Sequence, residues 1–174
     1  LPVNQLSQLV NMNKLIFLFV TLFGLGKLKK IPGSYASLAT TIFLFILFHV
    51  LNFSPNFILI GIIIIFLISL FVVNIFIRNL DDKDPKEVVV DEFIGQSIPI
   101  CLYEIAHVGT KETSQVLTFY FIMFILFRIF DIAKPYPVSY YDENFKNSFG
   151  VIMDDVCAGL YVVAVLVLYM VITS

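Results

Sequence analysis

Five carboxylates lie at or near the ends of segments that are otherwise almost wholly apolar. They are Asp91, Glu92, Asp131, Asp154 and Asp155. A charge at such a place is costly unless something offsets its desolvation, so a functional site is the default interpretation. The carboxylates would also repel one another unless they shared a cation. Because hard divalent ions take oxygen ligands, we expect a catalytic acidic site that holds Mg²⁺ through Asp91, Glu92, Asp154 and Asp155.

Basic residues stand beside one of these carboxylates. Arg128 lies three residues before Asp131 and Lys134 three residues after it, so all three share one helical face if the helix continues. We expect Arg128, Lys134 and Lys27 to bind the phosphate of a substrate. Carboxylates, a hard metal ion and such cations are the usual groups of phosphoryl chemistry. The residues leave the attacking group open: a water molecule, or one of the aspartates through a phospho-aspartate.

Glycines follow both acidic pairs at helical spacing. Gly95 lies four residues after Asp91, and Gly159 lies four residues after Asp155. We expect each acidic pair to open its helix, and residues four apart share a helix face. A missing side chain beside each carboxylate therefore predicts the close approach of a neighbouring helix or a ligand.

The composition predicts the class of fold that must position these residues. The chain has 174 residues, of which 59% are hydrophobic and only 14% charged, and its mean hydropathy is +0.94. A soluble domain is nearer half apolar and a quarter charged. The sequence therefore predicts an all-α polytopic membrane bundle. The net charge of −2 gives no indication of nucleic acid binding, and we interpret Cys101 and Cys157 as packing residues.

Hydropathy predicts about five membrane crossings. They cover residues 38–53, 57–77, 88–106, 116–132 and 151–173. Residues 15–25 are apolar but short of the roughly 20 that span a bilayer, so we expect a short interfacial or partly inserted helix there. We expect residues 1–11 to be a non-native or disordered extension, and residues 12–174 to form one membrane-embedded domain.

The basic residues predict the orientation of these crossings. The loop before the first crossing carries Lys27, Lys29 and Lys30, the next carries no Lys or Arg, and the third carries Arg78, Lys83 and Lys86. The fourth carries only Lys111, and the last carries Lys134 and Lys146, with Arg128 near the end of the crossing before it. Lys and Arg concentrate in cytoplasmic loops, so alternate loops face the cytoplasm. Both acidic pairs and the Arg128–Lys134 segment then share the cytoplasmic face of a cell membrane, where they can meet.

Simpler interpretations exist for single features. Acidic residues in a first helical turn are favoured by the helix dipole and by capping, and Arg128 with Asp131 can be an intrahelical ion pair. Lys27 can be a topology determinant, residues 81–85 a solvated loop, and residues 32–34 a turn followed by a cap. His49 and His107 lie at the opposite face and read as interfacial. Capping does not explain why both acidic pairs, Asp131 and the cations accumulate on one side.

Three blocks of the sequence resemble the phosphatidylglycerophosphatase A family over about residues 24–165. They are Gly24-Leu-Gly26 through Pro32-Gly33-Ser34 and Ser37; Val90-Asp91-Glu92-Phe-Ile-Gly95-Gln96; and Phe127-Arg128-Ile-Phe-Asp131-Ile-Ala-Lys134-Pro135-Tyr-Pro137 with Asp154-Asp155-Val-Cys-Ala-Gly159. The resemblance implies Mg²⁺-dependent removal of the terminal phosphate of phosphatidylglycerophosphate, giving phosphatidylglycerol. The chain departs from the family pattern at Lys29, at Ser34-Tyr-Ala36-Ser37 and at Asn147-Ser148, which affects loops rather than carboxylates.

Two other classes remain open. A small membrane transporter also uses intramembrane carboxylates as relays, although a carrier places them near the bilayer midplane. Another lipid-phosphate enzyme, a CDP-alcohol phosphatidyltransferase, carries widely spaced aspartates and glycines on a pair of helices, and no such run is present. A non-catalytic scaffold would not explain the clustered acids.

Overall fold

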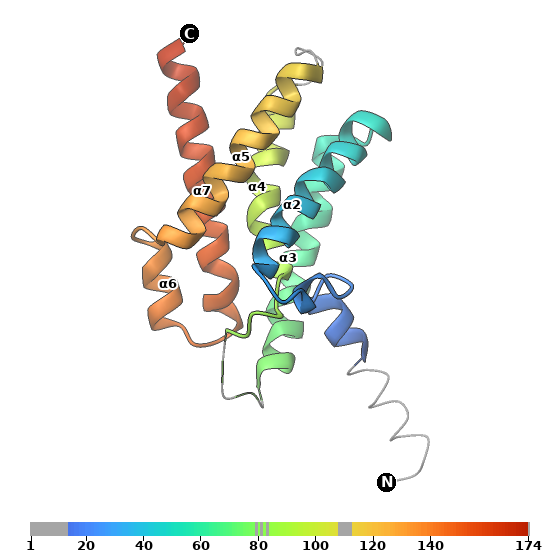
Figure 1. Ribbon diagram of the computed structural model, residues 1–174. Coiled ribbons are helices and arrows are strands. Elements are labelled where there is room, and N and C mark those ends of the chain that lie inside the picture. Colours follow the sequence, from blue (N-terminus) through green and yellow to red (C-terminus); the bar gives the residue numbers. More distant parts are fainter. Residues whose placement is uncertain (1–13, 79, 81, 83, 108–112, 174) are drawn as a thin grey trace.

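The computed structural model describes residues 14–78, 80, 82, 84–107 and 113–173, and all regular secondary structure among them is helical (Figure 1). A helix over residues 14–20 comes first. The elements that follow are the 3₁₀ turn η1 (Leu25–Lys27), α2 (Pro32–Phe45) continued by the π-helical turn η2 (Ile46–Val50), α3 (Pro55–Ile77), α4 (Val90–Ala106), α5 (Thr113–Ala133), α6 (Val138–Asn144) and α7 (Ser148–Thr173). The predicted all-α bundle is confirmed, whereas the proposed extension over residues 1–11 lies outside the described residues.

Four described helical segments are long and apolar enough to cross a membrane. They are Pro32–Val50, Pro55–Ile77, Ser114–Ala133 and Ser148–Ile172. The fifth predicted crossing corresponds to α4, whose 17 residues fall short of the roughly 20 that a bilayer requires. The first segment begins at Pro32 rather than at residue 38, because proline fits the first turn of a helix without losing a hydrogen bond.

The N-terminal apolar helix is shorter than the predicted 15–25. It ends at residue 20, and the backbone then takes positive φ angles at Leu22, Phe23 and Gly24 before η1. Residues in this left-handed region cannot continue a right-handed helix. The chain is thereby redirected toward the start of α2.

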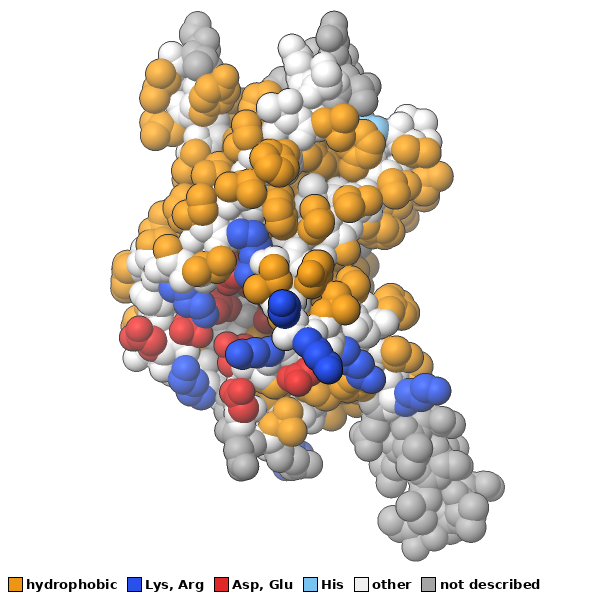
Figure 2. Space-filling model, in the orientation of Figure 1, with side chains coloured by type: hydrophobic (Ala, Val, Ile, Leu, Met, Phe, Trp, Pro, Cys, Tyr) orange, Lys and Arg blue, Asp and Glu red, His pale blue; other side chains and the backbone are white. Residues whose placement is uncertain are grey.

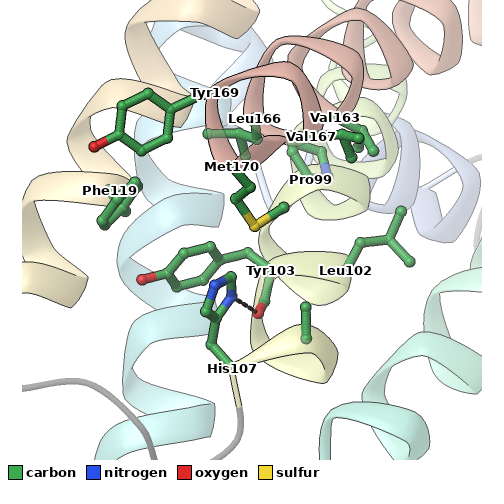
Figure 3. Close-up of a pocket in the computed structure, with 11 residues that line it drawn as sticks. Pro99, Leu102, Tyr103, His107, Phe119, Val163, Leu166, Val167, Tyr169 and Met170 are labelled. Carbon is green, nitrogen blue, oxygen red and sulfur yellow. Dashed lines mark hydrogen bonds between the residues drawn. The ribbon is translucent and has the colours of Figure 1, made fainter. Parts of the chain in front are cut away.

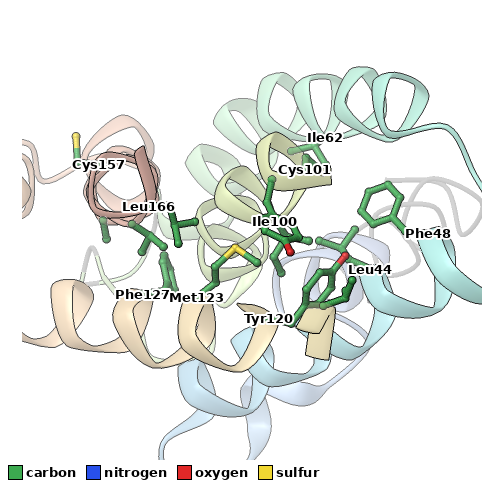
Figure 4. Close-up of a cluster of buried hydrophobic side chains, with 14 of the residues drawn as sticks. Leu44, Phe48, Ile62, Ile100, Cys101, Tyr120, Met123, Phe127, Cys157 and Leu166 are labelled. Atoms are coloured by element: carbon green, nitrogen blue, oxygen red, sulfur yellow. The ribbon is translucent and has the colours of Figure 1, made fainter. Parts of the chain in front are cut away.

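Helix α4 forms the centre of the bundle and packs against α2, α3, α5 and α7. Figure 4 shows side chains of these helices meeting around it, among them Leu44, Ile100, Met123 and Phe127, all of which are buried. Burying such apolar side chains against one another fixes the relative positions of the helices. Cys101 and Cys157 are free thiols in this core, as predicted.

The tightest crossing joins α4 to α7 at two glycines. A Cβ atom added at Gly159 would collide with the backbone oxygen of Gly95, and one added at Gly95 would lie against the backbone of Asp155. Only glycine lets two helix backbones come this close. The predicted close approach beside the acidic pairs is confirmed, and its partner is a neighbouring helix.

Helix α6 was not predicted as a helix. The chain turns after α5 at Lys134, which has a φ of 42°, and passes through a cis peptide bond between Tyr136 and Pro137. Helix α6 then packs along α7 at the end of the bundle where α7 begins (Figure 1). Figure 2 shows acidic and basic side chains gathered at this same end, below a surface that is almost wholly apolar.

Candidate active site

One cavity of about 300 Å³ lies where α2, α4 and α7 begin and α5 ends. Seven of the eight predicted site residues line it: Asp91, Glu92, Arg128, Asp131, Lys134, Asp154 and Asp155. These residues come from three helices and the turn after α5. The convergence that loop charges predicted is therefore present in the described structure.

Three of the carboxylates form a compact cluster. Asp91, Glu92 and Asp155 each place one oxygen so that all three oxygens lie within 4.8 Å of one another. Asp91 and Asp155 are buried, with only 6% and 3% of their surfaces exposed. Among the described residues, Glu92 Oε2 and Asp155 Oδ1 are buried without a hydrogen-bond partner. Buried, unpartnered carboxylate oxygens at this spacing are the donor set that a hard divalent cation prefers.

Helix capping does not account for both acidic pairs. Asp91 and Glu92 do lie in the first turn of α4, where the helix dipole favours them. The prediction that Asp154 and Asp155 open their helix is wrong, because α7 begins at Ser148 and this pair lies beyond its first turn. A buried pair at that depth gains little from the helix terminus, since the dipole effect falls off within one turn.

Arg128 of α5 contacts two side chains, one on its own helix and one on α2. Its Nη1 atom lies 2.9 Å from Asp131 Oδ2, which confirms the intrahelical ion pair, and donates to Ser37 Oγ of α2 at 3.3 Å. The Nε atom is buried and has no partner among the described residues. An arginine with an unused, buried donor beside carboxylates is placed to bind an additional anionic group.

Lys134 bridges two carboxylates across the chain. Its Nζ atom lies 2.8 Å from Asp154 Oδ2 and 2.7 Å from Asp142 Oδ1. Burial alone would lower the pKa of Lys134, but these two carboxylates outweigh it and hold the pKa above its usual value. Lys134 therefore stays cationic, and one oxygen of Asp154 is occupied by it. As a metal ligand, Asp154 stays a prediction, because it is not one of the three clustered carboxylates.

Lys27 is the one predicted site residue that does not line this cavity. It lies in η1, and its ammonium group sits 4.5 Å from the centre of the Phe17 ring. A cation over an aromatic ring is held by the ring's quadrupole. The geometry therefore favours the alternative interpretation of Lys27 as a topology determinant.

Other residues of the cavity escaped the sequence interpretation. Gly33, read as part of a turn, faces Glu92 so closely that a Cβ atom would collide with its carboxylate. Asp84, read as part of a solvated loop, is exposed but lines the cavity. Asp142 supplies the second partner of Lys134. Only the resemblance blocks pointed to Gly33, and no local pattern marked Asp84 or Asp142.

A different, apolar cavity of about 120 Å³ lies toward the other end of the bundle between α4, α5 and α7. Figure 3 shows its wall of aliphatic and aromatic side chains, with the His107 ring bonded to the backbone oxygen of Tyr103 at 2.9 Å. The described residues of its lining include no carboxylate and no Lys or Arg. The chemistry of the lining thus singles out the acidic cavity as the candidate active site.

A second polar cluster ties the same helices together away from the acidic cavity. Glu104 of α4 accepts a hydrogen bond from the Tyr120 hydroxyl at 2.9 Å and lies 3.1 Å from His49 Nε2. The interpretation of His49 as simply interfacial is therefore incomplete, because its ring is 27% exposed and paired. These contacts connect α2, α4 and α5, whose other ends all reach the active-site cavity.

Fold and site together define a class: a helical membrane protein whose charged cavity is suited to phosphate esters. Comparison with known proteins gives the particular family. A family model described as Phosphatidylglycerophosphatase A matches residues 18–170. The chain therefore belongs to the phosphatidylglycerophosphatase A family and is a phosphatase, a hydrolase of phosphoric monoesters.

Individual relatives agree with this family. A phosphatidylglycerophosphatase A of Haemophilus influenzae is 33% identical over 162 residues, covering 93% of this chain and 92% of the relative. A phosphatidylglycerophosphatase A of Escherichia coli is 27% identical over 139 residues, which cover 79% of this chain and 73% of the relative. A Bacteroides thetaiotaomicron protein provisionally named a phosphatidylinositol-3-phosphatase is 43% identical over 79 residues, 45% of each chain. No solved structure matches.

Proposed function

We propose that this chain is a Mg²⁺-dependent phosphatidylglycerophosphatase. It hydrolyses phosphatidylglycerophosphate to phosphatidylglycerol and phosphate, a step of phospholipid biosynthesis, in a bacterial inner membrane. The single observation that carries the proposal is the set of three clustered carboxylates, Asp91, Glu92 and Asp155, facing Arg128 and Lys134 in one cavity. The family of the chain agrees with the reaction class.

Mg²⁺ fits the donor set of this cavity. Asp91, Glu92 and Asp155 would hold the ion, and two of their oxygens are buried without partners among the described residues. When bound, the ion supplies positive charge that offsets the charge of the phosphoryl oxygens during reaction. In its absence the three carboxylates would repel one another. The proposal therefore predicts that activity depends on a divalent cation.

The cations of the cavity hold the phosphate. Arg128 presents a buried Nε donor that has no other partner in the described structure, and its Nη1 is steadied by Asp131 and Ser37. Lys134, fixed between Asp142 and Asp154, adds a permanent positive charge. A guanidinium and an ammonium in fixed positions orient a phosphate and stabilise the charge that develops on it.

The reaction breaks the bond between phosphorus and the glycerol oxygen and forms a bond between phosphorus and the oxygen of water. The glycerol oxygen leaves with a proton, which gives phosphatidylglycerol, and inorganic phosphate retains the other groups. Asp131 and Asp154 each carry a carboxylate at the cavity wall. Either can accept the proton of an attacking water, or itself attack phosphorus to form an acyl phosphate that water then hydrolyses. Both routes have the same net balance.

The proposed cytoplasmic placement rests on charge. Connecting segments that are rich in Lys and Arg alternate along the chain with segments that are poor in them. Segments rich in Lys and Arg face the cytoplasm. The described acidic residues of the cavity lie at the end of the bundle that the rich segments share (Figure 2). A phospholipid phosphate made at the cytoplasmic leaflet would meet the cavity there.

The decisive experiment measures phosphate release by the purified protein in detergent. Phosphatidylglycerophosphate should be hydrolysed with Mg²⁺ present and not after its removal by EDTA. Asp155→Asn should abolish release without affecting membrane insertion, because it removes one charge from the carboxylate cluster. Glu143→Gln, at an exposed position of α6, is the matched control and should retain activity.

Three outcomes would contradict parts of the proposal. No release with either Mg²⁺ or EDTA would remove the substrate assignment, and full activity of Asp155→Asn would remove the site assignment. Release from phosphatidylinositol 3-phosphate alone would keep the phosphatase class but change the headgroup. That last arm is included because of the partial match to the Bacteroides thetaiotaomicron relative.

A further inference from the structure

The active-site cavity has two chemically unlike edges. Asp84 and Lys86, from the connection before α4, line it and are exposed. Ile31 and Ile132 also line it, and they are 64% and 71% exposed. Residues that both line a cavity and remain exposed lie at its opening. The opening therefore has a charged edge and an apolar edge.

The apolar edge belongs to the membrane-facing surface. Ile31 is the residue before α2 and Ile132 lies in the last turn of α5, and both neighbouring segments are long and apolar enough to span a bilayer. Helices α2 and α5 pack together here and are tied by the bond from Arg128 to Ser37. Figure 2 shows acidic side chains recessed at this end, with a basic side chain next to them and the apolar surface beyond it.

The backbone at Ile31 supports a specific role for this edge. Ile31 has φ 43° and ψ 54°, the left-handed region. A β-branched residue rarely adopts that conformation, and such backbone strain clusters at functional sites. Glycine would adopt it without strain. An isoleucine held there places a large apolar side chain at the opening of a charged cavity.

We infer that the apolar edge of the opening, at Ile31 and Ile132, is a lateral entry site for the acylated part of a phospholipid. The lipid phosphate reaches the carboxylates and Arg128, while the glycerol and the first part of the acyl chains lie against the two isoleucines and continue into the bilayer. This inference rests on the proposed function and adds that the substrate is recognised through its chains as well as its phosphate. An amphipathic ligand matches an opening with one charged and one apolar edge.

Kinetics with and without acyl chains tests the inference. The substrates are dioleoyl phosphatidylglycerophosphate in mixed micelles and its deacylated, water-soluble headgroup. Ile132→Asn should raise KM for the acylated substrate about tenfold, which corresponds to about 1.4 kcal/mol. The rise in KM for the deacylated substrate should be at least about fivefold smaller. Ile129→Asn is the matched control: Ile129 is 51% exposed on the same helix and does not line the cavity.

A binding measurement that does not depend on turnover complements the kinetics. The chain contains no tryptophan, so Ile132→Trp and Ile129→Trp each introduce a single tryptophan, whose emission reports its position. Phosphatidylglycerol with brominated chains should quench the tryptophan at position 132 more strongly than brominated phosphatidylcholine does. At position 129 both lipids should quench equally.

Each outcome supports or overturns the inference. Equal losses on both substrates, or equal effects of the Asn variants at 129 and 132, would overturn it, as would equal quenching by the two lipids at position 132. Wild-type protein that releases phosphate from neither substrate would instead contradict the proposed function. The quenching experiment would then decide the lateral entry site alone.

Discussion

Replacing Gly159 by alanine tests how α4 and α7 bring the active-site carboxylates together. Gly159 meets the backbone oxygen of Gly95 where the helices cross, and a Cβ atom there would collide with it. Because the obstacle is backbone rather than a flexible side chain, the helices themselves must move apart. Asp155 lies one turn before Gly159, so it would move away from Asp91 and Glu92.

The expected loss of stability follows from packing, and the expected loss of activity follows from the position of the catalytic group. Overpacking a tight contact of this kind costs about 1–3 kcal/mol of stability, against about 1 kcal/mol gained from the better helix propensity of alanine. The net loss of stability is therefore small. Misplacing a catalytic group by about 1 Å can cost about 100-fold in rate, so the loss of activity should greatly exceed the loss of stability.

The assay compares kcat for phosphate release with the thermal unfolding midpoint of the protein in detergent. Gly61→Ala is the matched control, because an added Cβ atom at Gly61 in α3 would meet no atom within 4 Å. That variant should retain activity and gain about 0.5–1 kcal/mol of stability. Gly159→Ala should keep most of its stability and lose about 100-fold in kcat.

Wild-type kcat in Gly159→Ala would refute this reasoning, since the carboxylates would then tolerate a changed helix separation. A similar loss of activity in Gly61→Ala would also refute it, because the effect would belong to any alanine in the bundle. A Gly159→Ala protein with no unfolding transition would contradict the small loss of stability expected here.

Three further predictions concern single contacts. Arg128→Lys should lower kcat/KM about 10- to 100-fold, because it removes a charge-assisted hydrogen bond worth about 1.5–3 kcal/mol; an unchanged kcat/KM would exclude phosphate binding by the guanidinium. Lys134→Met should destabilise the protein by leaving Asp154 unpaired. Since its carboxylate partners raise the pKa of Lys134, the stability difference should persist as the pH rises from about 8 to about 10.4, the unfolded-state pKa of lysine, and should decline only above it. A difference that fades between about pH 8 and 9 would contradict the ion pair. Tyr120→Phe should cost about 1–3 kcal/mol by removing a donor to buried Glu104, seen as a lower unfolding midpoint at unchanged KM.

Hydropathy sufficed to predict most of the fold. Helices α3, α5 and α7 begin and end within a few residues of the predicted crossings, because lipid demands uninterrupted apolar segments. Helix α6 carries Ser139, Tyr140, Asp142 and Asn144, which gives no apolar stripe to detect. It is stabilised by packing on α7, a tertiary contact that a short local pattern does not encode.

The site residues that could be predicted from the sequence are those whose charge is unusual for the segment around them. Asp91, Asp131 and Asp155 stood out because charges are rare at the ends of apolar helices. Asp84 and Asp142 did not, because acidic residues are ordinary in polar loops. Asp142 meets Lys134 because of how the chain turns after α5, and Asp84 reaches the cavity from the connection before α4. Spacing along the sequence carries no signal of either arrangement.

The central position of α4 follows from an energetic constraint that its sequence does carry. The helix holds carboxylates near both ends, Asp91 and Glu104, and eleven of its 17 residues are buried, whereas only 17% of the spanning window of α3 is buried. Charged and amide side chains cannot face lipid cheaply, so such a helix must be enclosed by others. Enclosure also frees α4 from matching the thickness of the bilayer, since its neighbours do so. The helix least suited to lipid thus supplies two of the three clustered carboxylates, Asp91 and Glu92, and these two residues also shorten its apolar run.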